Sequence, residues 1–220
     1  MKSYFIIGTD TDCGKTYVTC ALTRYFQENH QTVMALKPVA SGCEEQQGKL
    51  VSDDASKLQA CNTNTKSMIC PWPLTLPVSP HLAAKADGIE LSAREITQFC
   101  QDGAWQAYDY LLVEAAGGLM VPLNDQETWI DVLKQSQIPV ILVVGMRLGC
   151  INHALLTISV LQMHDISCAG WIANCFQPDM LFLEENIATL SAKIPVPLLA
   201  AVREGTLILS DKVPSEKQLC

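Results

Sequence analysis

The sequence lacks a basic cluster, a long apolar run and a leader-like start. Its 220 residues contain 15 Lys and Arg against 23 Asp and Glu, a formal net charge of −8, and the cations are scattered. That distribution disfavours nucleic acid as a partner. The longest apolar run, residues 138–146, is about half of the ~20 residues that a membrane-spanning helix needs, and the first apolar run is too short for a signal-peptide core. We expect a cytoplasmic protein that contacts neither nucleic acid nor membrane.

Paired-cysteine spacing is also absent, although the chain has ten cysteines. No two of them form a C-x-x-C pair, and most lie in apolar stretches, where a free cysteine acts as a small hydrophobic residue. We expect reduced thiols with structural roles. No internal repeat or low-complexity segment divides the chain, and its 49% hydrophobic residues suffice for one core. The sequence predicts a single domain over residues 1–220, with a loose tail from about residue 210.

What the chain does contain is a glycine-rich turn between an apolar strand and a helical pattern. The apolar run at residues 4–7 is followed by G-T-D-T-D-C-G-K-T, residues 8–16. The backbone N–H groups of such a turn, together with the positive end of the next helix, bind phosphate. Lys15 would contact the outer phosphates, and the Thr16 hydroxyl would bind Mg²⁺. An ordinary strand-to-helix turn is the alternative, but the strand, turn and helix context favours a nucleoside triphosphate site.

This turn departs from the standard phosphate-binding pattern G-x-x-x-x-G-K-[ST]. Thr9 replaces the first glycine, and Gly8 comes one residue earlier. Switch-type ATPases of this fold carry a second lysine five residues before the loop lysine, where this chain has Asp10. No cation of the loop could therefore reach the nucleotide of a neighbouring subunit. The departure favours an enzyme that consumes ATP over a dimerising ATPase switch.

Apolar strand patterns alternate with amphipathic helix patterns along the chain. Strands are predicted at residues 4–8, 32–37, 110–114, 139–145, 167–173 and 197–202. Helices are predicted at residues 15–29, 51–60, 79–86, 92–101, 129–136, 152–164 and 180–193, with a capping box at Ser92 and Glu95. Strands without polar alternation are covered on both faces. The prediction is an α/β fold of the P-loop NTPase type: a mostly parallel sheet with helices on both faces, in three layers (αβα).

Charged residues at the predicted strand ends would meet at one edge of that sheet, where such folds bind ligands. Lys37 ends the second strand, and a solvated edge lysine is the alternative reading. Asp54 begins a helical segment and would contact a metal, although Ser52–Asp54 is also a good N-cap sequence. Glu114 ends a further strand and would contact Mg²⁺. It is not expected to be a core residue, because burying an unpaired carboxylate is costly.

A second glycine-containing turn, residues 145–153, opens a later helix. Its sequence is G-M-R-L-G-C-I-N-H, and a turn at a helix N-terminus suits a carboxylate. A plain turn and helix start is the alternative. His153 is expected to pack at the helix start rather than to act as a base.

Five motifs occur in a constant order between residue 4 and about residue 199. They are G-T-D-T-D-C-G-K-T, K-P-V-A-S-G at 37–42, S-P-H at 79–81, V-E-A-A-G-G at 113–118 and R-L-G-C-I-N-H-A at 147–154. Together they resemble dethiobiotin synthetase. The resemblance implies a homodimeric, ATP- and Mg²⁺-dependent carbon–nitrogen cyclo-ligase of biotin biosynthesis. Such an enzyme joins CO₂ to 7,8-diaminopelargonate and closes the ureido ring of dethiobiotin through a carbamate and a carbamic–phosphoric anhydride, releasing ADP and phosphate.

The same resemblance implies roles for individual residues. The implied catalytic residues are Lys37, Lys15 and Thr11, and the implied metal ligands are Thr16, Asp54 and Glu114. The implied nucleotide-binding residues are Asp12, Cys13, Gly14, Lys15, Thr16, Tyr17, Asp54, Glu114, Ala115, Ala116, Gly117, Asn174, Cys175, Arg203, Glu204 and Gly205. The implied substrate-binding residues are Ser41, Arg147, Gly149, Cys150, Ile151 and Asn152. The turn at 147–152 would serve the partner subunit, so that the substrate site is shared across the interface.

Three positions depart from the pattern of that family. Asp12 stands where a glutamate is common, so its side chain is one methylene shorter. Asn186 stands where a tyrosine often helps to hold the substrate carboxylate. Residues 200–203 read A-A-V-R, where the family usually continues G-x-I/L-P beside the adenine. These departures affect the reach of the loop, the substrate contact and the adenine contact.

Three other functions fit the pattern less well. A regulatory or partitioning ATPase is disfavoured by Asp10 and by the K-P-V-A-S-G segment. A cobyrinate-type amidase would need a glutaminase domain with a nucleophilic cysteine, for which the chain has no room. A non-catalytic paralogue has little physical reason to keep two lysines, two acids and a threonine converging on one cleft.

Overall fold

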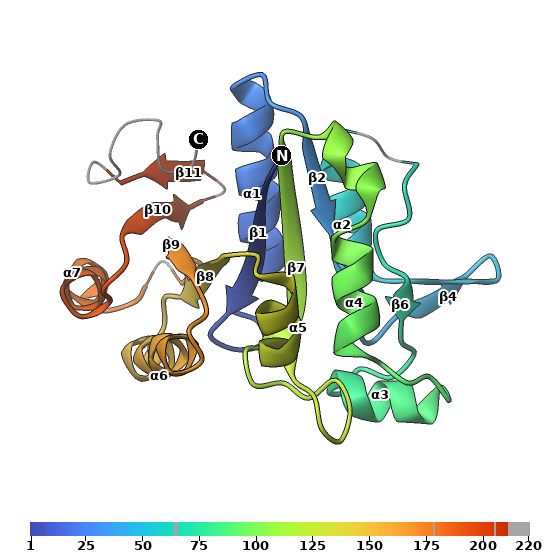
Figure 1. The fold of residues 1–220 in the computed structure, drawn as a ribbon. Helices are drawn as coiled ribbons and strands as arrows, with labels where there is room; N and C mark the ends of the chain where they lie inside the picture. The colour runs from blue at the N-terminus through green and yellow to red at the C-terminus, as the bar shows by residue number, and fades with distance from the viewer. Residues whose placement is uncertain (64–65, 178, 205, 211–220) are drawn as a thin grey trace.

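The computed structural model describes residues 1–63, 66–177, 179–204 and 206–210 (Figure 1). Its main sheet has seven strands in the order β11-β10-β9-β8-β1-β7-β2. Their bounds are β1 (Lys2–Gly8), β2 (Val33–Leu36), β7 (Tyr110–Gly118), β8 (Val140–Gly145), β9 (Cys168–Asn174), β10 (Leu198–Arg203) and β11 (Thr206–Leu209). β11 is antiparallel to β10, and the other neighbours are parallel. The predicted mostly parallel sheet is confirmed.

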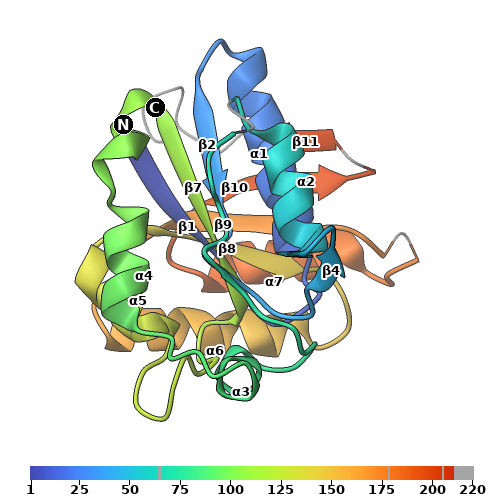
Figure 2. The ribbon, with the colours of Figure 1, turned by 90° about the vertical axis from the view of Figure 1, so that its right-hand side faces the viewer.

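Helices cover both faces of this sheet, as Figures 1 and 2 show. Their bounds are α1 (Lys15–Glu28), α2 (Asp53–Cys61), α3 (Pro80–Ala86), α4 (Ala93–Cys100), α5 (Trp129–Ser136), α6 (Cys150–Met163) and α7 (Leu183–Lys193), with a 3₁₀ helix η1 at Gly103–Ala107. α1 and α2 lie on one face, α4 to α7 lie on the other, and α3 lies at the end of the molecule where β7 ends. β2 and β8 are buried at every residue because helices cover both of their sides. The three-layer architecture is confirmed.

Several short strands were beyond the reach of the sequence prediction. β11 follows the strand that was expected to be the last. β4 (Glu44–Gln46) and β5 (Lys49–Val51) form an exposed hairpin, and β3 (Val39–Ala40) pairs with β6 (Trp72–Pro73). Each of these strands is two to four residues long, which is too short for hydrophobic periodicity to reveal it.

The predicted capping box at the start of α4 is wrong. The Ser92 side chain makes no capping hydrogen bond among the described residues. The Ala93 N–H donates instead to Glu127 Oε2 at 3.0 Å, so a side chain from a distant segment satisfies this helix start. A capping box does form at the start of α5, between Thr128 and Asp131.

Contacts at both ends fix the position of α2, the helix that carries Asp54. Ser52 caps the start, because the Ala55 N–H donates to Ser52 Oγ at 3.2 Å. At the other end, the Ala35 N–H of β2 donates to Asn62 Oδ1 at 2.6 Å, and Asn62 Nδ2 donates to Ala35 O at 3.0 Å. α2 is therefore held alongside β2, with Asp54 at the carboxyl end of that strand.

Two other expectations concern the whole chain. No helix of the described residues has the length and apolarity needed to cross a bilayer. The nine cysteines of the described part are all free, as the sequence predicted. Residues 211–220, which include most of the predicted tail, lie outside the described residues.

Candidate active site

The phosphate loop, residues 8–16, joins β1 to α1 and contacts the last residue of β9. Gly14 precedes α1 in a left-handed conformation, with φ of +86°. Asn174 Nδ2 donates to Cys13 O at 2.9 Å. A Cβ at position 14 would lie 1.9 Å from Asn174 Nδ2. Both the backbone conformation and this close approach therefore require glycine.

The side chain of Lys15 folds back onto the phosphate loop. The residue is 7% exposed, and its Nζ donates to the backbone oxygen of Asp10 at 3.0 Å. The N-terminus of α1 begins at the same residue, so a lysine cation and the positive end of a helix dipole coincide. This combination suits a polyphosphate.

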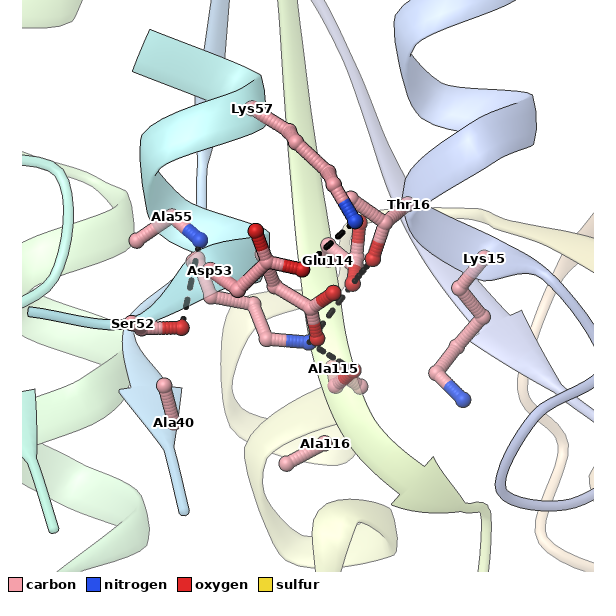
Figure 3. Close-up of polar contacts among 12 residues, drawn as sticks. Lys15, Thr16, Ala40, Ser52, Asp53, Ala55, Lys57, Glu114, Ala115 and Ala116 are labelled. Carbon is pink, nitrogen blue, oxygen red and sulfur yellow. Dashed lines mark hydrogen bonds and ion pairs between the residues drawn. The ribbon is translucent and has the colours of Figure 1, made fainter. Parts of the chain in front are cut away.

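A buried ionic cluster lies beside the loop, next to the end of β2 and the middle of β7. Glu114 was predicted to end its strand, but β7 continues to Gly118 because the residues that follow keep pairing with β1. Figure 3 shows Glu114 at the centre of the cluster, next to Thr16 and the Ala115 backbone. Glu114 has no solvent exposure, and its Oε1 accepts hydrogen bonds from Lys37 Nζ at 2.6 Å and Thr16 Oγ1 at 2.7 Å. Lys37 Nζ also lies 3.3 Å from Asp54 Oδ2 and 3.3 Å from Ala115 O. With 3% exposure, Lys37 is not the solvated edge lysine that the sequence left open.

Mutual attraction keeps this cluster charged. Burial disfavours the ammonium of Lys37, but the carboxylates of Glu114 and Asp54 outweigh it and raise the pKa of Lys37 above its usual value. Burial likewise disfavours the Asp54 carboxylate, yet Lys37 and a hydrogen bond from Thr16 bring the pKa of Asp54 below its usual value. The cluster therefore presents both signs of charge at neutral pH.

The oxygen atoms of the cluster fit a divalent cation. Thr16, Asp54 and Glu114 offer one hydroxyl and two carboxylates, which are the hard donors that Mg²⁺ prefers. Glu114 Oε2 is buried and has no hydrogen-bond partner among the described residues. The described residues contain no group of three or more His, Cys, Asp or Glu side chains that is arranged to hold a metal. The three groups beside the loop are thus the candidate ligands, with the remaining coordination left to phosphate oxygens and water.

A cavity of about 1050 Å³ opens over both the loop and the cluster. Twelve predicted site residues line it: Thr11, Asp12, Gly14, Lys15, Thr16, Tyr17, Lys37, Ser41, Asp54, Glu114, Ala116 and Gly117. Its volume is at the upper end of the ~300–1,000 Å³ typical of small-molecule sites. One space therefore brings together the phosphate loop, the buried lysine and both carboxylates.

Part of the cavity wall was not predicted as site. Pro77–Pro80, which leads into the first residue of α3, forms one side, and Arg24 and Lys57 belong to the side formed by α1 and α2. The S-P-H motif at 79–81 was an available signal for the first group. Nothing in the spacing of the α1 and α2 residues distinguishes them from an ordinary helix surface.

The predicted adenine-side residues lie outside this cavity in the described part of the chain. Asn174 and Cys175 are buried at the end of β9, and Arg203 at the end of β10 pairs with Glu184 of α7. Glu204 has a φ of +47°. Gly205, a predicted nucleotide contact, lies outside the described residues. Cys13 and Ala115 are buried; the Cys13 backbone oxygen accepts from Asn174, and the Ala115 backbone oxygen accepts from Lys37.

The second glycine turn, residues 147–152, also does not line the cavity among the described residues. Gly149 precedes α6 with φ of +94°, and Leu148 is fully exposed. Arg147 forms an ion pair with Asp10, and His153 Nδ1 lies 3.4 Å from the same carboxylate. His153 thus lies at the helix start, as predicted, while the link from this turn to the phosphate loop was missed.

The fold and the site define a P-loop NTPase-type α/β protein. Cell division protein FtsY of Thermotoga maritima matches with a TM-score of 0.60 over 96% of this chain and 65% of its own, at 13% identity. A ParA family ATPase of Chlorobium tepidum matches with a TM-score of 0.53 over 92% of this chain and 84% of its own, at 15% identity. At such identities the likeness shows the fold alone.

Sequence relatives narrow the class to a family. A family model described as an AAA domain matches residues 2–208. ATP-dependent dethiobiotin synthetase BioD of Legionella pneumophila (strain Lens) is 52% identical over 205 residues, covering 93% of this chain and 95% of its own. The protein of that name from Cellvibrio japonicus is 41% identical over 220 residues, covering 99% and 96%. The chain belongs to the ATP-dependent dethiobiotin synthetase family, as the motifs predicted.

The close packing of the phosphate loop can be tested with Gly14→Ala. The new Cβ would collide with Asn174 Nδ2, 1.9 Å away, and would also strain a backbone with φ of +86°. Because the loop must shift, we expect ATP affinity, measured with a fluorescent ATP analogue, to fall by at least about tenfold (~1.4 kcal/mol).

Gly48→Ala is the matched control for this substitution. Gly48 also has a positive φ, +77°, but an added Cβ would meet nothing within 4 Å. It should lower the free energy of unfolding by only about 1–2 kcal/mol of backbone strain and leave ATP affinity unchanged. If Gly14→Ala binds ATP as well as Gly48→Ala does, the loop does not depend on this packing.

Proposed function

We propose that this chain catalyses the ATP- and Mg²⁺-dependent conversion of 7,8-diaminopelargonate and CO₂ into dethiobiotin, ADP and phosphate. The observation that carries the proposal is the single cavity in which the phosphate loop meets the buried Lys37, Glu114 and Asp54. Membership of the dethiobiotin synthetase family supports the same reaction. The whole described chain, built on one main sheet, is taken as one catalytic domain.

ATP is assigned to the phosphate loop and to the ends of β9 and β10. The loop N–H groups and Lys15 bind the phosphates, and Lys15 moves from the backbone oxygen of Asp10 to do so. Asn174 supports the loop through Cys13 and lies where the base is expected. Cys175 after β9 and Arg203 and Glu204 at the end of β10 are assigned to the rest of the adenine side.

The two amines of the diamine are assigned to the part of the cavity lined by Thr11, Lys37 and Ser41. One amine adds to CO₂ and loses a proton, which gives a carbamate. A carbamate oxygen attacks the γ-phosphorus of ATP and ADP leaves, which gives a carbamic–phosphoric anhydride. The second amine then attacks the carbonyl carbon and loses a proton, and phosphate leaves with the bridging oxygen.

Positioning and charge account for the catalysis, and no nucleophilic side chain is needed. The second attack is intramolecular, so correct alignment can remove about 7–11 kcal/mol of barrier. Lys15 and Lys37 supply positive charge where the carbamate and phosphate oxygens accumulate negative charge. Mg²⁺ held by Thr16, Asp54 and Glu114 supplies further neutralisation of the phosphate oxygens when bound.

The substrate carboxylate is assigned to the turn at residues 147–152 of a second copy of the chain. That turn lies outside the cavity of its own chain in the described part, and it exposes Leu148 fully. The N–H groups at the start of α6 suit a carboxylate. A homodimer in which each turn completes the partner's site explains both features.

The nine free cysteines of the described part fit the cytoplasm, where we place the reaction. We assign no role to nucleic acid or membrane.

Two departures from the family pattern have a structural basis in this chain. Asp12 lines the cavity in a left-handed conformation with φ of +61°, which aspartate tolerates better than most residues. Asn186 is half-buried, and its Nδ2 donates to Phe182 O at 2.7 Å at the start of α7. We therefore assign Asn186 to its own helix and not to the substrate carboxylate.

Phosphate release from MgATP tests the proposed reaction. The wild-type chain should release phosphate only when the diamine and bicarbonate are both present. Lys37→Met removes a charge at the reacting groups and should slow release by at least about 100-fold. Lys49→Met, in the exposed β4–β5 hairpin, is the control and should leave the rate unchanged. Release that is indifferent to the diamine would contradict the proposal and indicate an ATPase switch.

Mixing two defective variants tests the shared site. Lys37→Met damages the site in its own chain, and Asn152→Ala should damage the site in the partner. A mixed dimer then contains one site with both an intact lysine and an intact turn, so random exchange should restore about one quarter of wild-type activity. Mixed dimers that regain no activity, or a wild-type chain that is monomeric by light scattering, would show that each chain uses its own turn.

A further inference from the structure

Lys37 occupies the space between the candidate metal ligands. Its Nζ lies 2.6 Å from Glu114 Oε1 and 3.3 Å from Asp54 Oδ2. The third candidate ligand, Thr16, donates its hydroxyl to the same Glu114 oxygen at 2.7 Å, as Figure 3 shows for Thr16 and Glu114. Two of the three side chains expected around a divalent cation therefore contact an ammonium, and the third shares an oxygen with it.

The buried carboxylate of Glu114 needs a cation beside it even when no ligand is bound. Glu114 has no solvent exposure, and a buried carboxylate without a partner would be strongly destabilising. Lys37 neutralises the Glu114 carboxylate and donates a hydrogen bond to it. It does not use all of the capacity of the carboxylate, since Glu114 Oε2 has no partner among the described residues.

The backbone of Lys37 is fixed while its side chain is long. The Lys37 N–H donates to Ile69 O at 3.0 Å, so the end of β2 is anchored. The four-carbon side chain can still direct its ammonium to more than one position. The same cavity is lined by Thr11 and Ser41, where the substrate amines are assigned.

We propose that the Lys37 ammonium is a placeholder for the divalent cation: it neutralises Glu114 and Asp54 until the metal arrives and is then displaced toward the substrate. The inference rests on the metal site of the proposed function. Two cations that share the same carboxylate oxygens repel each other, so binding of one weakens binding of the other. Metal binding thereby delivers Lys37 to the substrate side of the cavity, and a chain without metal keeps this lysine tied to its carboxylates.

Metal binding without nucleotide tests the competition directly. Mn²⁺ serves as the probe, and the free ion is measured by electron paramagnetic resonance with the full chain. Lys37→Met keeps a long side chain but removes the competing charge. Its Mn²⁺ affinity should exceed that of the wild type by about tenfold or more, the scale of coupling between two ligands of one site. Equal affinities would overturn the proposal, because they would mean that the metal and Lys37 use separate oxygens.

Two further variants serve as controls. Lys57→Met removes a lysine that lines the same cavity but pairs with the exposed Asp53, so it should change Mn²⁺ affinity by less than about twofold. The double variant Lys37→Met/Glu114→Gln leaves no buried charge unpaired and should fold, but it should lose the gain in Mn²⁺ affinity. If Lys57→Met binds Mn²⁺ as tightly as Lys37→Met, the gain reflects net charge alone and the proposal fails.

A stability measurement covers the case in which Lys37→Met folds poorly. The variant should have a lower melting temperature than the wild type, and Mn²⁺ should raise that temperature more in the variant than in the wild type. Equal stabilisation of the two chains would overturn the proposal. Neither readout requires the diamine or turnover, so failure of the ligase assay leaves this test intact, and failure here leaves the ligase reaction standing.

Discussion

The carboxylate of Glu114 is buried without solvent exposure in the middle of β7, and the candidate active site is organised around that charge. A carboxylate in this position must be paired, and it takes Lys37 from the end of β2 and Thr16 from α1 as partners. Asp54, at the start of α2, joins through Lys37. Four elements therefore meet at the cavity through contacts with Glu114 and Lys37.

The phosphate loop has a second support from β9, which lies on the other flank of β1 from β7. Asn174, at the end of β9, donates to Cys13 O and packs against Gly14, so the loop is supported where it turns into α1. The hydrogen bond between Thr16 and Glu114 connects this loop to the ionic cluster. The phosphate loop and the ionic cluster are thus joined by a direct hydrogen bond along one wall of the cavity.

Local patterns predicted the parts of this molecule that local physics decides. Fully apolar strands, amphipathic helices and the loop at residues 8–16 gave the fold class, and the parallel strands brought Lys37 and Glu114 to one edge. Contacts between segments far apart in the sequence could not be predicted from these local patterns. The pairing of Asp10 with Arg147 across 137 positions, and the replacement of the Ser92 cap by Glu127, depend on tertiary geometry that no local spacing encodes. The burial of Lys37 was also not decided by its position in the sequence.

The fate of the oxygen atoms of CO₂ tests the central claim, that a carbamate attacks ATP in this cavity. The chain would be supplied with the diamine, MgATP and ¹⁸O-labelled bicarbonate, and phosphate and dethiobiotin would be examined by mass spectrometry. The account predicts a single ¹⁸O in each phosphate released and a single ¹⁸O in the ureido carbonyl, because the bridging oxygen of the anhydride leaves with phosphate. Unlabelled phosphate would mean that water, and not a carbamate, attacks the γ-phosphorus, and the ligase mechanism would be contradicted.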